Sequence, residues 1–284
     1  MSVIIGIDAG GTTTKIVGAY LSNGKINLIK PQFVTANDPK TAIYGAFGKF
    51  TTENNIKISD IEKIMMTGVG SSHVDGDIYG VKCEKVSEFD AIGIGGLFTA
   101  ELDSALVVSL GTGTALVHAT RGGKMTYLGG TGVGGGTLIG LSHLLLKADT
   151  ISHIEEYSQN GDLANIDLRI GDISLDTTML NGELTASNFG NVSDIAGKAD
   201  IAKGILNMVY ETVGMISIFA AHSVNAEKIV LTGNLTRLDY CRVKSDFFNS
   251  MHSTYGVDFI IPENAEYATV IGTALYGLKK GSNV

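Results

Sequence analysis

Short apolar runs rich in β-branched residues occur in two pairs along the chain, and a glycine-containing turn separates the members of each pair. Residues 3–7 and 13–20 form the first pair, and residues 106–110 and 115–119 form the second. Runs of this kind, bounded by glycine, are typical of antiparallel strands joined by a tight turn. The pattern therefore predicts two β-hairpins of the same plan, one in each half of the chain.

Elsewhere, apolar residues return with the spacing of helices and of further buried strands. Helices are expected over residues 40–55, 87–102, 137–147, 201–223 and 268–279, and strands over residues 61–67, 228–232 and 258–261. Strands that alternate with helices in two successive halves predict an α/β protein of two related lobes. The segment IIGIDAGGTTTKIV in the first half corresponds to LVVSLGTGTALVH in the second half. This correspondence indicates a coarse duplication. A polar break at Glu101 and Asp103 predicts two domains, residues 1–102 and 103–284.

The composition narrows the class of protein. With 284 residues, 44% of them hydrophobic, the chain can bury a substantial core, which excludes a disordered or fibrous protein. The net charge of −8 and 21 thinly spread basic residues argue against a nucleic-acid partner. Neither a run of about 18 apolar residues nor a basic leader stands out, so we expect no membrane partner and no signal peptide. Cys83 and Cys241 match no metal or disulfide motif, and a reducing cytoplasm is the expected location.

The turns of the two hairpins carry residues suited to phosphate. The candidates are Asp8, Gly10, Gly11, Thr12, Thr13 and Lys15 in the first hairpin, and Gly111, Thr112, Gly113 and Thr114 in the second. Successive backbone N–H groups of a glycine turn can surround a phosphate, and an aspartate can hold Mg²⁺. A plain hairpin turn favours the same residue types. Two such turns in one chain favour a polyphosphate gripped from both sides.

Two further glycine segments are candidates for nucleotide contact. The glycine tract 129–136 runs directly into an apolar helix, and glycines at this place leave the first N–H groups of a helix free for an anion. The candidates for nucleotide contact here are Gly135, Gly136, Thr137, Leu138 and Ile139. A flexible linker is the alternative. Gly233 and Asn234, directly after the strand at 228–232, form the second segment.

The helix at 87–102 begins with three polar side chains. Ser87 and Asp90 have the spacing of a capping box, whereas Glu88 has no such duty. Glu88 is therefore either a solvated side chain of the first turn, which the pattern alone favours, or a general base. A general base here would accept the proton of a substrate hydroxyl. The six histidines show no metal-ligand spacing.

With these motifs in this order, the chain resembles the type II pantothenate kinases of the acetate kinase/sugar kinase/Hsp70/actin superfamily. The matching segments are DAGGTTTK (8–15), EFDAIGIGG (88–96), LGTGTA (110–115), GGTGVGGGTLIGL (129–141) and IGTALYGL (271–278). The stretches NGDLANIDLRIGDI (160–173) and GELTASNFGNV (182–192) have no generic explanation and are the most discriminating part. The resemblance implies a duplicated, two-lobed actin-like ATPase (ribonuclease H-like) fold, with the active site in the cleft between the lobes.

The resemblance also implies an activity, which is ATP-dependent phosphorylation of pantothenate to 4'-phosphopantothenate, the first step of coenzyme A biosynthesis. ATP and Mg²⁺ are the implied cofactors. Glu88 would be the catalytic base, Asp8 would hold the metal, and the glycine segments would contact the nucleotide. Thr112 and Thr114 would lie beside pantothenate. The family is typically dimeric, so a homodimer is expected, with the helix at 201–223 contributing to the interface.

One position departs from the family's pattern. The family usually has an arginine just ahead of the glycine tract, whereas this chain has Tyr127, with Arg121 and Lys124 a few residues earlier. Pantothenate is an anion, so either one of these basic residues takes the place of the arginine from a shifted loop, or the substrate is bound in a different way. Two other functions stay open. One is another small-molecule kinase of the superfamily, such as an N-acetylhexosamine kinase, and the other is an ATP-binding sensor without turnover.

Overall fold

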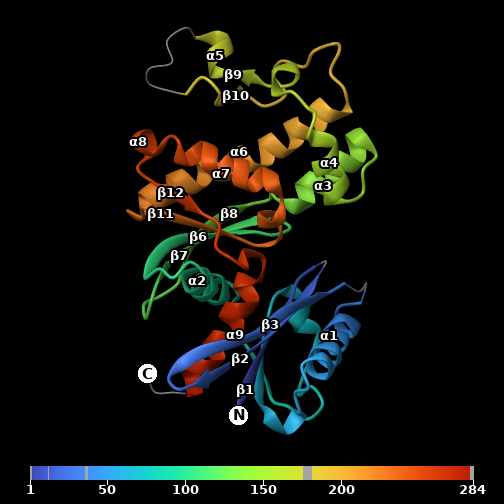
Figure 1. Ribbon diagram of the computed structural model, residues 1–284, viewed down its shortest axis with the longest axis vertical. Coiled ribbons are helices and arrows are strands. Elements are labelled where there is room, and N and C mark those ends of the chain that lie inside the picture. The colour runs from blue at the N-terminus through green and yellow to red at the C-terminus, as the bar shows by residue number, and fades with distance from the viewer. Residues whose placement is uncertain (1, 12, 36–37, 175–180, 282–284) are drawn as a thin grey trace.

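Two five-stranded mixed sheets form the framework of the molecule, one in each of two stacked lobes (Figure 1). The computed structural model describes residues 2–11, 13–35, 38–174 and 181–281, with the side chains of residues 279–281 left out. The strands of the first sheet, in spatial order, are β3 (Lys25–Val34), β2 (Thr14–Ser22), β1 (Val3–Ala9), β4 (Ile61–Thr67) and β5 (Cys83–Lys85). Those of the second sheet are β8 (Thr126–Thr131), β7 (Thr114–Thr120), β6 (Ser104–Leu110), β11 (Lys228–Thr232) and β12 (Asp258–Ile260).

The two sheets share one topology. In each sheet, three antiparallel strands follow one another through hairpins, and two parallel strands then extend the sheet beyond the first of them. The two predicted hairpins correspond to β1–β2 and β6–β7. The predicted duplication is therefore confirmed at the level of strand order and direction.

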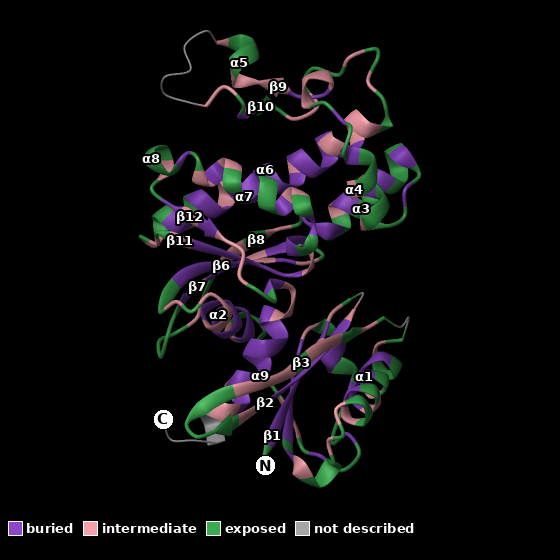
Figure 2. Ribbon diagram, viewed as in Figure 1, coloured by how far each residue is buried: buried purple, intermediate pink, exposed green. Residues whose placement is uncertain are grey.

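The helices cover both sheets, and two of them lie between the lobes. Their bounds are α1 (Pro39–Glu53), α2 (Glu88–Thr99), α3 (Gly135–Leu146), α4 (Ile151–Ser158), α5 (Ile170–Ile173), α6 (Lys198–Ser223), α7 (Asp239–Asn249), α8 (His252–Tyr255) and α9 (Ala268–Gly281). Helix α1 packs on the first lobe, and α6 lies over the second sheet (Figure 1). Figure 2 shows that buried residues concentrate in the two sheets and along α6.

Helices α2 and α9 cross between the lobes. Helix α2 precedes the predicted boundary at residue 103, yet it packs on β6 and β7 of the second sheet. Helix α9 ends the chain and packs on β1, β2 and β4 of the first sheet. The two helices also pack against each other. The last helix of each half of the chain therefore packs on the sheet formed by the other half.

The predicted helices and strands are present, with local differences. The glycine tract was expected to be an irregular lead-in to a helix, but its first residues belong to β8, which pairs with β7. Helix α3 accordingly begins at Gly135. Strand β3 was not predicted, because Pro31 and scattered charges interrupt its apolar pattern. Proline is tolerated there since β3 is the edge of its sheet.

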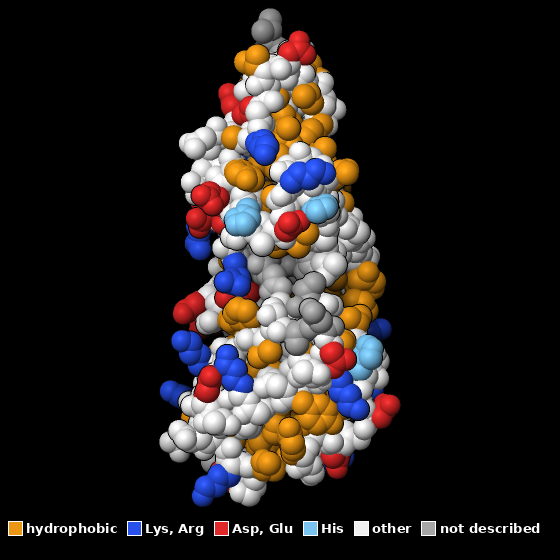
Figure 3. Space-filling view, turned by 90° about the vertical axis from the view of Figure 1, so that its right-hand side faces the viewer, with side chains coloured by type: hydrophobic (Ala, Val, Ile, Leu, Met, Phe, Trp, Pro, Cys, Tyr) orange, Lys and Arg blue, Asp and Glu red, His pale blue; other side chains and the backbone are white. Residues whose placement is uncertain are grey.

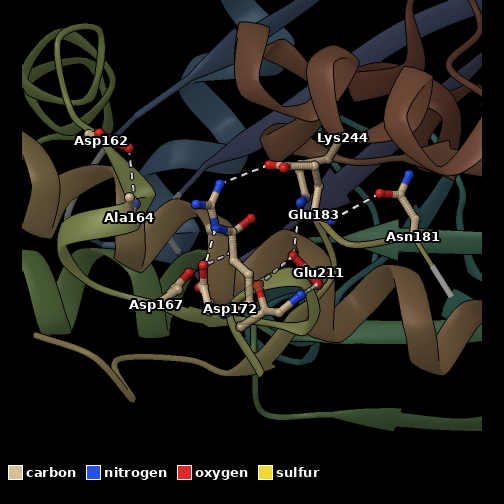
Figure 4. Close-up of polar contacts among 11 residues, drawn as sticks. Asp162, Ala164, Asp167, Asp172, Asn181, Glu183, Glu211 and Lys244 are labelled. Carbon is tan, nitrogen blue, oxygen red and sulfur yellow. Dashed lines mark hydrogen bonds and ion pairs between the residues drawn. The ribbon is translucent and has the colours of Figure 1, made fainter. Parts of the chain in front are cut away.

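Residues 159–197, which we call the distal segment, lie at the end of the second lobe (Figure 1). The described part of this segment holds α5, the two-stranded pair β9 (Leu168–Arg169) and β10 (Thr185–Ser187), and a short 3-10 helix at Leu163–Asn165. Glu211 of α6 accepts hydrogen bonds from the backbone N–H and the hydroxyl of Thr185, and it pairs with the buried Lys244 of α7 at 2.9 Å (Figure 4). Buried polar contacts of this kind fasten the distal segment to the body of the lobe.

Helix α6 also has the length and hydropathy of a membrane-crossing helix. Of the apolar window that meets this criterion, 67% is buried inside the protein. The helix crosses beneath the distal segment and over the second sheet, so its apolar residues have a partner in the fold. This is the environment of a core helix in a two-layer lobe.

Candidate active site

The turns of the two hairpins face the same cavity between the lobes. The Gly10 N–H donates to the Thr13 carbonyl at 3.0 Å in the first turn, and the Gly111 N–H donates to the Gly113 carbonyl at 2.9 Å in the second. Both turns line a cavity of about 620 Å³. The predicted residues that this cavity brings together are Asp8, Gly10, Gly11, Thr13, Lys15, Glu88, Gly111, Thr112, Gly113, Thr114, Tyr127, Gly233 and Asn234. Thr12 lies outside the described residues.

Gly68 and Gly233 close the cavity in equivalent ways. Each follows the parallel strand next to a hairpin, at φ +83° and +94°, where side chains are rarely tolerated. A Cβ on Gly68 would lie 2.5 Å from the Ala9 carbonyl oxygen, and one on Gly233 would lie 2.5 Å from that of Leu110. The chain therefore crosses directly over the end of each hairpin strand, and only glycine fits at these two crossings.

Asp8 and Lys15 lie opposite each other on the first hairpin. Burial raises the pKa of the Asp8 carboxyl, and the nearby Lys15 opposes this rise. Burial lowers the pKa of Lys15, whose ammonium donates to the Glu266 carbonyl just ahead of α9. Lys15 thus ties β2 to the start of α9, while the Asp8 carboxylate faces the cavity.

Glu88 is the first residue of α2 and lines the same cavity. Glu88 is exposed, but the protein around its carboxyl removes enough solvent that desolvation raises the carboxyl's pKa, and the charge of Asp8 raises it further. The expected capping box is wrong: the Ser87 side chain makes no cap hydrogen bond, and the backbone of Ser87 alone starts the helix. A carboxylate with a raised pKa in a cleft is suited to accept a proton.

Tyr127 lines the cavity from β8 and stacks on Phe89. The two ring centroids are 4.0 Å apart and the planes differ by 16°. Phe89 follows Glu88 directly, so the aromatic pair lies beside the candidate base. This contact joins the start of α2 to β8, and sequence reasoning did not anticipate it, because no local pattern relates residues so far apart.

Several predicted residues lie elsewhere. The N–H groups of Gly135 and Gly136 donate to the carbonyls of Gly111 and Thr112, at 2.9 and 2.8 Å, so they brace the second turn. Leu138 is fully buried in the core of the second lobe, while Thr137 and Ile139 do not line the cavity. The tract thus holds the turn in place through the first N–H groups of α3.

Arg121 also lies away from the cavity. Its side chain donates to the Asp103 carboxylate at 2.6 Å and to the Leu102 carbonyl at 3.0 Å. Thr114 begins β7 and Arg121 directly follows its last residue, so the whole length of the strand separates them. Arg121 instead borders a separate, mainly apolar cavity of about 390 Å³ behind α2 and α9.

A second cavity of about 600 Å³ adjoins the first and shares Thr13, Lys15 and Asn234 with it. Arg237 and Tyr267 line it from the second lobe, and Phe33 lines it from β3, with the Arg237 guanidinium 5.7 Å from the Phe33 ring centroid. These residues were not predicted, since no motif marks them. Asp8 and the glycines of both turns line the first of these two cavities alone.

Asp8 is the side chain best suited to a divalent metal. Within the described ranges, no three His, Cys, Asp or Glu side chains gather as a metal site. Mg²⁺ commonly takes only one or two protein carboxylates and completes its shell with phosphate oxygens and water. A half-buried aspartate beside two phosphate-type turns fits that mode of binding.

The protein-family model and the relatives that match this chain agree on one family. The protein-family model described as Fumble matches residues 100–245. Type II pantothenate kinase of Bacillus thuringiensis subsp. konkukian is 30% identical over 253 residues, covering 82% of this chain and 83% of that protein. The enzyme of the same name from Bacillus cereus strain ATCC 14579 is 31% identical over 251 residues, covering 82% and 84%.

Solved structures agree in fold. The activator of 2-hydroxyisocaproyl-CoA dehydratase from Clostridium difficile, with bound ADPNP, is 18% identical, with a TM-score of 0.67 over 98% of this chain and 95% of that one. Component A of (R)-2-hydroxyglutaryl-CoA dehydratase from Acidaminococcus fermentans is 19% identical, with a TM-score of 0.67 over 99% of both chains. The predicted two-lobed actin-like ATPase fold is confirmed.

Proposed function

The chain belongs to the type II pantothenate kinase family, and on this premise we propose that it transfers the γ-phosphoryl group of ATP to the hydroxyl of pantothenate. The products are 4'-phosphopantothenate and ADP. The observation that carries the proposal is one cavity lined by both glycine turns, Asp8 and Glu88. Phosphate-binding turns, a metal-binding carboxylate and a general base are the parts that a small-molecule kinase needs.

Glu88 is the proposed general base. Its carboxylate takes the proton of the acceptor hydroxyl while that oxygen bonds to the γ-phosphorus, and the bond from the γ-phosphorus to the β–γ bridging oxygen breaks. The raised pKa of Glu88 favours this role, because a base works best when its pKa approaches the working pH. A carboxylate with an ordinary pKa would accept the proton less readily.

Asp8 and the turns are the proposed binding groups for the phosphates. Mg²⁺, held by Asp8, would neutralise negative charge that develops on the phosphate oxygens. Backbone N–H groups of the two turns add further positive dipoles. Gly233 lines the first cavity and Asn234 lines both, so the adenosine is proposed to extend toward Arg237 and Tyr267 in the second.

Four wider properties of the chain are part of the proposal. The reaction would be the first step of coenzyme A biosynthesis, carried out in the cytoplasm, where the free thiols of Cys83 and Cys241 stay reduced. The active form would be a homodimer. We also propose that residues 1–102 and 103–284 correspond to the duplicated halves, with α2 and α9 exchanged between the lobes.

An acceptor panel tests the proposal. Purified protein is incubated with Mg-ATP and either pantothenate, N-acetylglucosamine or no acceptor, and phosphorylated products are detected by mass. Phosphopantothenate is the expected product. A phosphosugar would leave the fold intact and replace the function with that of a hexosamine kinase. Measurable ATP binding with no product from any acceptor would favour the sensor.

A further inference from the structure

The apolar cavity behind α2 and α9 is separate from the proposed active site. Among the described residues, none lines both this cavity and either of the two cavities proposed for ATP. Its volume of about 390 Å³ lies within the range of roughly 300–1,000 Å³ that small-molecule sites occupy. The space is therefore large enough for a small organic ligand, and the proposed kinase reaction does not use it.

The walls of this cavity come from both lobes and from the two helices between them. Leu21 and Ile26 lie opposite each other on the β2–β3 hairpin of the first lobe, and Met125 comes just before β8 of the second. Leu97 of α2 and Leu275 of α9 also line the cavity. Because Leu21 and Ile26 are 48% and 41% exposed, the hairpin offers apolar surface that a ligand can reach.

Arg121 gives this apolar cavity one charge. The other described residues that line it are apolar or glycine. The guanidinium has five N–H donors, of which the bonds to the Asp103 carboxylate and the Leu102 carbonyl use two. Asp103 is itself largely exposed, so it competes only weakly with a second anion. The cavity thus combines hydrocarbon walls with a single cation.

We propose that this cavity binds a small straight-chain carboxylate, with the alkyl chain against the apolar walls and the carboxylate at Arg121. Removal of an alkyl chain from water into an apolar space is favourable. A carboxylate accepts charge-assisted hydrogen bonds from a guanidinium, often two at once. An alkyl ammonium of the same length would gain the first effect and be repelled by the cation. The proposed site holds whichever acceptor the kinase uses.

A ligand in this cavity would contact the same two helices that border the proposed active site. Glu88, the first residue of α2, and Thr269, the second of α9, line the active-site cavity, whereas Leu97 and Leu275 lie farther along these helices. The two sites therefore lie at different ends of one helix pair. Mg-ATP and the carboxylate should be able to bind at the same time, because they share no described lining residue.

Calorimetric titration of the full chain with octanoate, octanol and octylammonium tests the proposal, since these probes have the same chain length and differ at the polar end. We expect one octanoate site per chain, with an affinity about fivefold higher than that for octanol, the gain expected from a half-exposed ion pair. Octylammonium should bind most weakly. Arg121→Gln should remove the preference for octanoate and leave the affinity for octanol unchanged.

A second variant tests the location of the site. Ile26→Glu places a carboxylate on the apolar wall and should weaken octanoate binding by about tenfold or more, because charge on the wall opposes both the chain and the anion. Ile58→Glu is the matched control. Ile58 is 48% exposed on the same lobe and does not line the cavity, so this variant should bind octanoate like the wild type. Both substitutions change side chains that solvent already reaches.

Octanoate that binds together with Mg-ATP, and loses affinity in both Arg121→Gln and Ile26→Glu, would establish the site. Absence of saturable octanoate binding would overturn the proposal. Binding that saturating Mg-ATP abolishes would also overturn it, since the ligand would then occupy the nucleotide cavities. Binding that Ile26→Glu leaves unchanged would place the ligand elsewhere on the molecule. The acceptor panel is independent of these results, so the kinase assignment stands or fails separately.

Discussion

The groups around Glu88 make it suited to act as the proposed general base. The first turn of α2 projects into a cavity that Asp8 shares, and desolvation and the Asp8 charge both raise its pKa. Asp90, two residues later on the same turn, does not line the cavity. The two carboxylates therefore form a matched pair, one inside the proposed site and one outside it.

Glu88→Gln should lower kcat by about 10²- to 10⁴-fold, the usual contribution of a general base, and leave ATP affinity unchanged. The amide has nearly the same shape but cannot take the hydroxyl proton. Single-turnover phosphoryl transfer and ATP titration measure the two effects. Asp90→Asn is the control and should retain normal turnover. Near-normal turnover in Glu88→Gln would show that another group is the base.

The pH dependence of kcat/KM gives a second test at this residue. Glu88 acts as a base only when ionised, so the rate should fall as pH decreases through its pKa. Because that pKa is raised, the fall should occur above the ordinary glutamate value of 4.5. ATP binding followed over the same pH range is the control, since protonation of Asp8, whose pKa is also raised, would weaken nucleotide binding instead. A rate that stays constant down to the ordinary range would contradict the assignment.

At the residue level, the sequence was informative where chemistry follows from local spacing. Asp8 and Lys15 lie opposite each other because a hairpin of that length pairs them, and both reach the cavity. Arg121 could not be placed in this way. It is close to Tyr127 in sequence, but Tyr127 pairs with Val117 in the middle of β7, whereas Arg121 lies beyond the end of that strand and pairs with Asp103. The stack of Phe89 on Tyr127 is likewise a tertiary contact without a local signal.

At the scale of elements, the crossing of α2 and α9 depends on glycines. A Cβ on Gly95 would overlap the Ala268 carbonyl of α9, and one on Gly272 would overlap the Ala91 carbonyl of α2. The two helices therefore approach until backbone meets backbone. The sequence showed that α2 is apolar and rich in glycine, but a helix with no polar face over residues 91–97 does not reveal which sheet it covers.

Gly95→Ala should destabilise the protein by about 1–3 kcal/mol or more, because the added methyl group separates two packed helices. Gly45→Ala is the control: Gly45 lies within α1, where nothing lies within 4 Å of an added Cβ. That substitution should leave stability unchanged or raise it by up to about 1 kcal/mol, through lower entropy of the unfolded chain. Urea unfolding curves measure both, and equal effects in the two variants would disprove the close crossing.

The surface of the whole molecule is mixed in character. On the face shown in Figure 3, Lys and Arg side chains are interspersed with acidic and apolar ones, in keeping with the net charge of −8. The distal segment also carries exposed apolar residues: Ile173, Val192 and Ile195 are 62%, 56% and 82% exposed. This segment contains the stretches that most clearly indicated the family. Its fold could not be predicted, because it has little regular structure and depends on buried contacts with Glu211 and Asn207.

The exchange of α2 and α9 makes the two lobes one unit, and this has a thermodynamic consequence. Residues of both lobes line the proposed nucleotide site, so Mg-ATP should stabilise the whole molecule rather than one lobe. At a hundred times its Kd, a ligand that binds only the folded state adds about 2.7 kcal/mol. We therefore expect calorimetry to show a single unfolding transition that moves upward by several degrees with Mg-ATP. Glu88→Gln should show the same shift, because it keeps the phosphate-binding groups. Two transitions, of which only one responds to the nucleotide, would mean that the lobes unfold separately and that the nucleotide is held by one of them alone.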